Sequence, residues 1–356
     1  MTCKNKTCHE IEVSVIIPVH NSEEWLDECL KSVLDQDFNG KIQVSIYDDC
    51  SIDKSWSKLK LWEREFLHNG LDVVLEKSIY NAALGVGYAR NRAVKNSSGR
   101  FLCFLDSDDV MTADRIRVQH GRALQNLDAI IGSRFVRWPK DSTLRFTKWA
   151  NNLEDSNQQL YTQAFTSHGP TLIMPTWFIS RKTFDKVGGF DESGKGTPED
   201  LIFFYQHLKL AGKLCRCPEV LLTYRYHKNC STFSVSESVI WDLRVQFLQE
   251  RIIRNWSSFT IWNAGKQGRK LYRSLSPLNQ KKVIAFCDVD VKKINQGFYI
   301  YEHSTEIPKP KVPIIHFTEA QPPIIICVKL DLTDGEFEKN LELLHLQEGV
   351  DYIHFN

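Results

Sequence analysis

Residues 101–109 read Phe-Leu-Cys-Phe-Leu-Asp-Ser-Asp-Asp, and this stretch decides the fold. An apolar run of this length, bounded by polar residues, predicts a buried β-strand at 101–105. Three carboxylates follow it, on Asp106, Asp108 and Asp109, and they would repel one another unless a positive charge lay between them. A hard divalent cation, Mn²⁺ or Mg²⁺, takes such oxygen ligands and also holds diphosphates. The alternative is a solvated acidic turn that caps the next helix.

The first 110 residues alternate strand and helix patterns. Strands are predicted at 13–19, 44–47, 73–75 and 101–105, and helices from Asn21 or Ser22 to Leu34, at 54–67, and from Gly85 onward. Such alternation predicts an α/β fold with a parallel sheet and helices on both faces. Ligands of these sheets bind beyond the carboxyl ends of the strands, where His20-Asn21, Asp48-Asp49 and Asp106–Asp109 all fall. Residues 140–235 are less regular, and we expect them to form the acceptor side.

A second, smaller α/β unit is predicted after a helix at 236–256. Strands are expected at 259–262, 283–286, 314–317 and 324–328, with a helix at 269–275, which is a Rossmann-like layout. Asn263 replaces the first glycine of a G-x-G-x-x-G turn, so we expect a scaffold or binding role rather than a cofactor site. The expected domains are 1–257, which includes a helical extension at 236–257, and 258–356.

The overall composition is that of an ordinary globular protein. Its 356 residues suggest two domains, and 42% hydrophobic and 25% charged residues are typical values. A net charge of +1 indicates no partner, and the ten cysteines show no metal-binding spacing and suit a reducing compartment. The N-terminus is polar and no stretch has 18 consecutive apolar residues. We therefore expect a cytoplasmic protein without a membrane segment.

Seven motifs, in order, resemble those of family 2 glycosyltransferases. They are Val-Ser-Val-Ile-Ile-Pro-Val-His-Asn at 13–21, D-D-x-S-x-D at 48–53, G-x-A-R-N at 87–91, D-x-D at 106–108, G-G-F-D-E at 188–192, E-D at 199–200 and Y-R-x-H at 224–227. The family usually carries Tyr where this chain has His20. The resemblance implies a GT-A fold, which is a Rossmann-like nucleotide-sugar-binding domain, and a metal-dependent, inverting transfer from a UDP-sugar.

The resemblance also implies roles around the donor. Pro18, Val19, His20 and Asn21 would line the base pocket, with His20 stacked on uracil. Asp48 or Asp49 would accept a hydrogen bond from uracil N3, although Asp is also common in simple turns. Arg90, beside Asn91, would pair with one of these two carboxylates or reach the diphosphate, because its planar fork suits both.

The metal site is expected to centre on Asp108. Asp106 would contact the ribose or a metal-bound water, and Asp109 would substitute for either residue or cap the helix. His227 would be a further ligand, and the alternative for His227 is an ordinary surface histidine.

Asp200 is the expected catalytic base. It would take the proton from the acceptor hydroxyl as that oxygen attacks the anomeric carbon of the sugar. A single displacement inverts the configuration, so an α-linked UDP-sugar gives a β-glycoside. Glu199 would orient the acceptor or support a loop. Without the family resemblance, the two acids would simply complement the dipole of a helix over 201–210.

Residues 244–282 contain nine Lys or Arg and a single acid, Glu250. Trp256, Trp262 and Tyr272 are interleaved with them. Such a stretch fits phosphate contacts and base stacking in RNA, and the alternative is solvated helix faces. The candidate RNA contacts are Arg251, Arg254, Lys266, Arg269, Lys270 and Arg273.

The whole chain also resembles glycosyltransferases that act on queuosine in tRNA. That resemblance implies UDP-galactose as the donor and queuosine in the anticodon of a tyrosine-type tRNA as the acceptor. Two alternatives remain open. One is β-1,3 transfer of N-acetylglucosamine to a sugar or protein, and the other is a non-enzymatic module that binds nucleotide-sugar or RNA. Loss of the D-x-D motif or of the base would favour the latter, yet both are intact.

Overall fold

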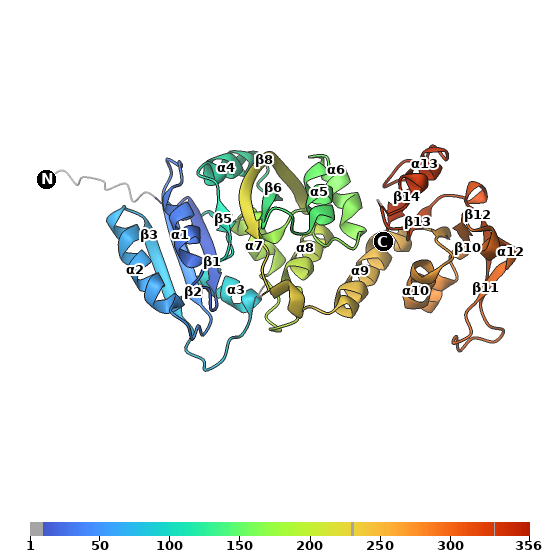
Figure 1. Ribbon diagram of the computed structural model, residues 1–356, viewed down its shortest axis with the longest axis horizontal. Coiled ribbons are helices and arrows are strands. Elements are labelled where there is room, and N and C mark those ends of the chain that lie inside the picture. Colours follow the sequence, from blue (N-terminus) through green and yellow to red (C-terminus); the bar gives the residue numbers. More distant parts are fainter. Residues whose placement is uncertain (1–9, 229–230, 331) are drawn as a thin grey trace. The chain divides into compact units, whose positions relative to one another are not determined.

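The computed structural model describes residues 10–228, 231–330 and 332–356, and the chain divides into two compact units (Figure 1). The first unit comprises the residues up to Leu160 together with Pro170–Ser236, and the second comprises Tyr161–Gly169 and Glu237–Asn356. None of the helices in the described part of the chain is long and apolar enough to cross a membrane. Each unit has its own sheet.

The first unit is built on an eight-stranded sheet in the order β3-β2-β1-β4-β7-β6-β8-β5. Its parallel half consists of the four predicted strands, here β1 (Val13–Val19), β2 (Ile42–Asp48), β3 (Asp72–Lys77) and β4 (Phe101–Phe104). β1 lies between β2 and β4, with Val13 opposite both Ile42 and Phe101. All residues of β1 and β4 are buried, on both faces of these strands, which explains why the two strands read as continuous apolar runs. The predicted α/β fold is confirmed.

Three helices connect the strands of this half: α1 (Leu26–Leu34), α2 (Ser55–His68) and α3 (Val86–Asn96). The next helix, α4 (Arg115–Gln125), packs against the other half of the sheet. The prediction that Asn21 or Ser22 caps the first helix is wrong, because α1 begins after Trp25. The Asn21 side chain instead accepts a hydrogen bond from the Ile52 N–H, and Ser22 Oγ lies 2.7 Å from Ser107 Oγ. Both side chains therefore contact the turns that follow other strands, and they do not cap the helix.

The stretch from 140 to 235 is more regular than we expected. Two strands precede it, β5 (Val110–Met111) and β6 (Ala129–Trp138), and two lie within it, β7 (Phe178–Ser180) and β8 (Lys213–Arg225). Its helices are α5 (Leu144–Asn152), α6 (Asn157–Thr162), α7 (Arg181–Val187) and α8 (Glu199–Lys209). It also has 3₁₀ turns at Met174–Thr176 and Ser231–Ser234. β6 and β8 are parallel, and their register shifts near Ser133 and Arg134. Pro218 and Glu219 interrupt the apolar pattern of β8 at this irregularity, which hid the strand in the sequence.

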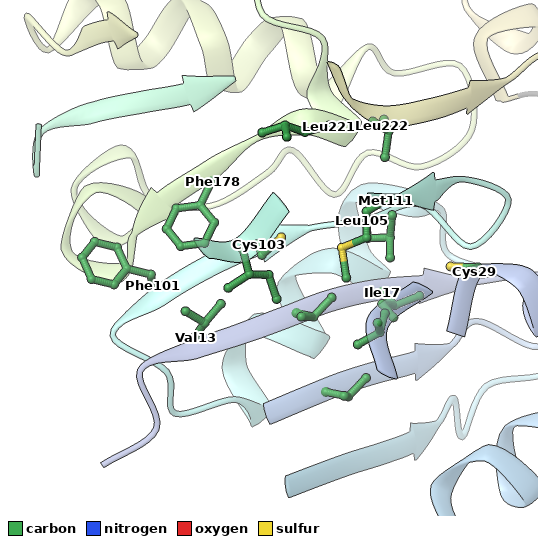
Figure 2. Packing of buried hydrophobic residues seen from close by; sticks show 14 of the residues in the cluster. Val13, Ile17, Cys29, Phe101, Cys103, Leu105, Met111, Phe178, Leu221 and Leu222 are labelled. Atoms are coloured by element: carbon green, nitrogen blue, oxygen red, sulfur yellow. The ribbon is translucent and has the colours of Figure 1, made fainter. Parts of the chain in front are cut away.

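The core of the first unit fixes the ends of the central strands. Val13 and Ile17 of β1 lie beside Phe101, Cys103 and Leu105 at β4, all of them wholly buried (Figure 2). Alternate residues of a strand share one face, so this set forms a single layer. Side chains from other elements complete the cluster, among them Cys29, Met111, Phe178, Leu221 and Leu222. The acidic turn that follows Leu105 is thereby anchored on rigid strands.

The second unit has the predicted Rossmann-like layout. Its sheet has the order β11-β12-β10-β9-β13-β14 and is parallel except for β11. The strands are β9 (Phe259–Trp262), β10 (Val283–Asp288), β11 (Phe298–Ile300), β12 (Lys311–His316), β13 (Ile324–Ile326) and β14 (Tyr352–His354). The helices are α9 (Glu237–Arg251), α10 (Lys266–Ser274), α11 (Pro277–Gln280), α12 (Val291–Asn295) and α13 (Glu336–Glu342), with 3₁₀ turns at Gln163–Phe165, Ile253–Asn255 and Phe317–Glu319.

Helix α9 belongs to the second unit, whereas we expected it to extend the first domain. Trp241 donates from its indole nitrogen to Ser274 Oγ at 2.9 Å. Arg244 donates to the carbonyl oxygens of Phe165 and Asn356, each at 2.9 Å. These bonds join the helix to α10, to residues 161–169 and to the chain end. The division therefore falls at residue 236 rather than at the expected 257.

The glycine turn after β9 serves close packing. A Cβ atom on Gly268 would lie 1.9 Å from the carbonyl oxygen of Asn263, so only glycine lets α10 approach the strand this closely. Asn263 itself has a positive φ of 121°. The close packing of α10 on the turn therefore accounts for Gly268, and this glycine is no evidence for a cofactor site.

Candidate active site

The turn after β2 contains two buried carboxylates with different surroundings. Both oxygens of Asp49 accept hydrogen bonds from the backbone N–H groups of Leu84 and Gly85, at 2.8–3.0 Å. Asp48 Oδ1 accepts the Ser51 N–H at 2.9 Å, while its Oδ2 is buried and has no partner among the described residues. Asp49 therefore holds the loop before α3, and Asp48 keeps the free oxygen that a donor base would need.

The end of β1 is bonded to that same turn. Pro18 and Val19 are buried in the strand, and the Val19 carbonyl accepts the Asp49 N–H at 2.8 Å. His20 is exposed; its Nδ1 donates to the Asp49 carbonyl at 2.6 Å, and its Nε2 accepts from Asn21 Nδ2 at 3.0 Å. Asn21 also donates its backbone N–H to Ser51 Oγ. Both ring nitrogens of His20 are therefore engaged within the protein. The face of the ring is available to a nucleobase.

The acidic turn after β4 gathers three carboxylates. Oxygen atoms of Asp106, Asp108 and Asp109 all lie within 4.8 Å of one another. Asp109 is wholly buried; its Oδ1 accepts the Arg225 N–H at 2.9 Å, and its Oδ2 has no partner among the described residues. Burial, and then the neighbouring charges of Asp108 and Asp106, raise the pKa of Asp109 well above its ordinary value. Clustered oxygen ligands with an unpartnered buried oxygen fit a hard divalent cation.

His227 lies beside this cluster, as the sequence predicted. Its Nε2 is 2.9 Å from Asp108 Oδ2, and the hydrogen bond to Asp108 raises the pKa of His227 despite partial burial. The imidazole ring stacks on the indole of Trp25, with ring centroids 5.1 Å apart. The structure thus brings together all the predicted metal ligands, and it adds Trp25, which the sequence did not single out.

Arg225 is a second residue that sequence reasoning missed. Its Nη1 donates to the Asp108 carbonyl at 2.9 Å, its backbone N–H donates to Asp109, and its Nη2 pairs with Glu28. The guanidinium also lies over the Trp25 ring, 5.1 Å from the centroid. Arg225 therefore fixes the acidic turn. The only signal for it in the sequence was its place in the Y-R-x-H motif.

Arg90 connects the acidic turn to α8. The buried guanidinium donates from Nη2 to Asp106 Oδ1 and from Nη1 to Glu199 Oε1, each at 2.6 Å. The expected pairing of Arg90 with Asp48 or Asp49 is wrong, because the guanidinium bonds to Asp106 and Glu199 instead. The single guanidinium of Arg90 thereby connects the candidate metal site to the candidate catalytic acids.

Glu199 and Asp200 are the first two residues of α8. Burial raises the pKa of Glu199 to about 7, although Arg90 acts in the opposite direction. Burial likewise raises the pKa of Asp200, again against the effect of Arg90. Asp200 Oδ1 accepts the Leu201 N–H at 2.7 Å, a helix-end contact that agrees with the structural alternative for this pair. Carboxyl groups whose pKa is raised also suit proton transfer.

Asn91 faces a different part of the site than we expected. Its Nδ2 donates to the Phe190 carbonyl and to Glu192 Oε1, each at 2.8 Å, and its Oδ1 accepts the Phe190 N–H at 2.9 Å. The amide thus holds the G-G-F-D-E turn. A Cβ atom on Gly87, one helical turn earlier, would lie 2.2 Å from the Asp191 carbonyl oxygen. Helix α3 is therefore packed tightly against the turn that precedes Glu199.

The basic stretch lies in the second unit and divides into several environments. Arg244 is buried, and Trp262 and Tyr272 are each 2% exposed, so these two rings are core residues that have no face for a nucleobase. Arg251 is half-buried, with its Nε 3.5 Å from the Tyr161 hydroxyl, whereas Arg254 is exposed. The other four candidates, Lys266, Arg269, Lys270 and Arg273, all lie on α10.

The chain can now be compared with known proteins. Residues 14–188 match the family model described as glycosyl transferase family 2. Solved structures support a GT-A fold. The crystal structure of Staphylococcus aureus TarS 1–349 in complex with UDP-GlcNAc has a TM-score of 0.56 at 19% identity, over 75% of this chain and 71% of that one. The mannosyltransferase PcManGT from Pyrobaculum calidifontis, in complex with GDP-Man and Mn²⁺, has a TM-score of 0.51 at 17% identity, over 77% and 69%.

Two relatives show how far the sequence similarity extends. The poly(ribitol-phosphate) β-N-acetylglucosaminyltransferase TarS of S. aureus is 34% identical over 108 residues, which are 30% of this chain and 18% of TarS. The chain thus matches less than a fifth of that protein. The uncharacterized glycosyltransferase RT0329 of Rickettsia typhi is 27% identical over 320 residues, which are 83% of this chain and 94% of the relative.

Proposed function

We propose that the first unit transfers a hexosyl group from a UDP-sugar to an acceptor hydroxyl with inversion of the anomeric configuration. The observation that carries this proposal is Arg90, whose guanidinium joins Asp106 of the acidic turn to Glu199, next to Asp200. A cation-binding cluster and a pair of carboxylates with raised pKa then adjoin at the carboxyl edge of one sheet. That edge is where ligands of parallel α/β sheets bind.

Each residue of the site has its own role in the proposed reaction. Asp48 offers Oδ2 to the uracil base. Asp106, Asp108 and His227 would hold a divalent cation, Mn²⁺ or Mg²⁺, which neutralises negative charge on the diphosphate. Asp200 accepts the proton of the attacking hydroxyl as the new C–O bond forms at the anomeric carbon and the bond to UDP breaks, with the electron pair leaving on UDP. Glu199, held by Arg90, orients the acceptor.

For the donor and acceptor, we propose UDP-galactose and queuosine in a tRNA anticodon, giving a β-galactoside. The similarity of the whole chain to glycosyltransferases that act on queuosine supports this choice, and so do the four cations on α10. The second candidate is transfer of N-acetylglucosamine, which the UDP-GlcNAc complex of TarS favours.

The experiment that separates these candidates supplies labelled UDP-galactose or labelled UDP-N-acetylglucosamine, with Mn²⁺, to total tRNA. The tRNA is prepared from cells grown with and without queuine. We expect label from UDP-galactose only on the tRNA that contains queuosine. Label from UDP-N-acetylglucosamine, or none on either tRNA, would contradict this assignment and would move the acceptor to a sugar or protein.

A further inference from the structure

We propose that one face of α10 binds the phosphate backbone of an RNA. This cationic face consists of Lys266, Arg269, Lys270 and Arg273. The inference rests on the proposed RNA acceptor, and it adds the surface of the second unit that would hold that RNA.

The sequence of α10 makes this helix strongly amphipathic. Gly268, Leu271 and Tyr272 are buried against the second unit. The four cations recur at intervals of three and four residues, so they share the opposite side of the helix. The nine residues of α10 include no acid. At about 1.5 Å of rise per residue, the charges form a line roughly 10 Å long.

The four charges have no acidic partner in the described part of the chain. Within the described residues, no carboxylate lies within ion-pair distance of any of them. Three other cations of the same unit are paired: Lys293 with Asp288 at 2.9 Å, Lys339 with Glu336 at 3.2 Å, and Lys281 with Glu306 at 3.4 Å. The cationic face is therefore a local concentration of positive charge in a chain whose net charge is only +1. Such a face favours a polyanion.

Aromatic rings hold three of the four side chains in place. Lys270 Nζ lies 3.8 Å from the centroid of the Trp241 ring, and the Arg269 guanidinium lies 5.0 Å from that of Tyr299. Arg273 Nη1 is 3.4 Å from the Tyr299 hydroxyl. Cations that are already ordered lose less side-chain entropy when they bind a ligand.

A membrane surface fits this face less well than RNA does. Amphipathic helices that bind membranes insert an apolar face into the lipid, whereas the apolar side of α10 is already buried in the protein. A line of unpaired cations without exposed apolar residues suits a repeating phosphate chain, which is bound mainly through counterion release. The contacts would be independent of sequence, because phosphates carry no base information.

The test compares two double variants that remove the same charge. K266Q/R273Q removes the two exposed cations of the face, and K213Q/K339Q removes two exposed, ion-paired cations outside the basic stretch. Binding of full-length protein to labelled tRNA is measured by fluorescence anisotropy over a series of salt concentrations, without donor. We expect K266Q/R273Q to bind at least about tenfold more weakly at low salt, with the slope of log K against log salt reduced by roughly 1.4–1.8. The control variant should keep the wild-type slope.

Equal binding by the two variants would overturn the proposal, and so would tighter wild-type binding to phosphatidylserine vesicles or polyglutamate than to tRNA. Because tRNA with and without queuosine should bind alike, this assay does not depend on the transfer reaction. Loss of binding in K266Q/R273Q would support the RNA surface even if the transferred sugar were not galactose. Transfer to tRNA with unchanged binding in that variant would refute the surface and leave the proposed reaction standing.

Discussion

At the scale of single residues, the acidic turn makes a prediction about metal binding. Asp108 contributes an oxygen to the three-carboxylate cluster and also contacts His227, so D108N should weaken Mn²⁺ binding most. We expect a loss of at least about tenfold in affinity for D108N and a smaller loss for H227Q. Titration of Mn²⁺ in the presence of UDP, followed by electron paramagnetic resonance, measures both. D35N, on the surface, is the control, and equal affinity of D108N and D35N would refute the assignment.

Glu199 makes a prediction about stability and pH. Its pKa rises from an ordinary 4.5 to about 7 in the folded protein. Between these values the folded state holds a proton that the unfolded chain has released, so stability falls as pH rises through this window. The free energy of unfolding of the wild type, relative to E199Q, should fall by roughly 2–3 kcal/mol from pH 4.5 to 7 and then level off. Denaturant titrations in EDTA measure it; parallel curves for the two proteins would contradict the burial argument.

The residues of the site could largely be named from the sequence, but their partners could not. Asp106, Asp108, Glu199 and Asp200 stand out by residue type and position. The link through Arg90 joins residues 16 and 109 positions away along the chain, and no local pattern reports such a contact. The same limit applies to Asp48 and Asp49, which look alike in sequence. Only the loop at Leu84 and Gly85, folded back onto Asp49, distinguishes them.

At the scale of elements, the approach of α3 to the G-G-F-D-E turn depends on Gly87. An alanine Cβ there would lie 2.2 Å from the Asp191 carbonyl oxygen and 3.3 Å from Glu199 Cβ. G87A should destabilise the protein by about 1–3 kcal/mol and lower transfer, because the turn before Glu199 must move. Thermal unfolding and transfer rate are measured together.

The matched control for G87A is G121A in helix α4. A Cβ atom on Gly121 meets nothing within 4 Å, so alanine should be neutral or stabilise the helix by up to about 1 kcal/mol. Similar effects of the two substitutions on stability and transfer would show that Gly87 has no special packing role.

The elements themselves were predictable where the apolar pattern is uninterrupted. β1 and β4 follow directly from runs of buried residues, and α2 and α3 from the helical patterns between strands. β6 and β8 were missed, because β8 contains Pro218 and Glu219 within its 13 residues and pairs with β6 through a shifted register. The start of α1 was misjudged, since Asn21 and Ser22 satisfy tertiary partners rather than the helix end.

At the scale of the whole molecule, the chain combines a GT-A unit, which contains most of the match to the glycosyl transferase family 2 model, with a second, Rossmann-like unit. The boundary between them was harder to predict than the units, because α9 reads as a continuation of the first domain. Trp241 and Arg244 assign α9 to the second unit instead. Their hydrogen-bond partners, Ser274, Phe165 and Asn356, are distant in sequence. The basic stretch was recognised correctly as a charge pattern, but only the structure separates its core aromatics from its exposed cations.

The measurement that tests the central claim most directly is the transfer rate of D200N, with UDP binding followed in parallel by calorimetry. Removing the base should lower the rate by about 10²–10⁴-fold, while the affinity for UDP stays within about twofold of the wild type. D128N, a surface aspartate that pairs with Lys213, is the control and should transfer at the wild-type rate. A D200N rate close to that of the wild type would contradict the account, since no other residue is assigned to take the proton of the acceptor.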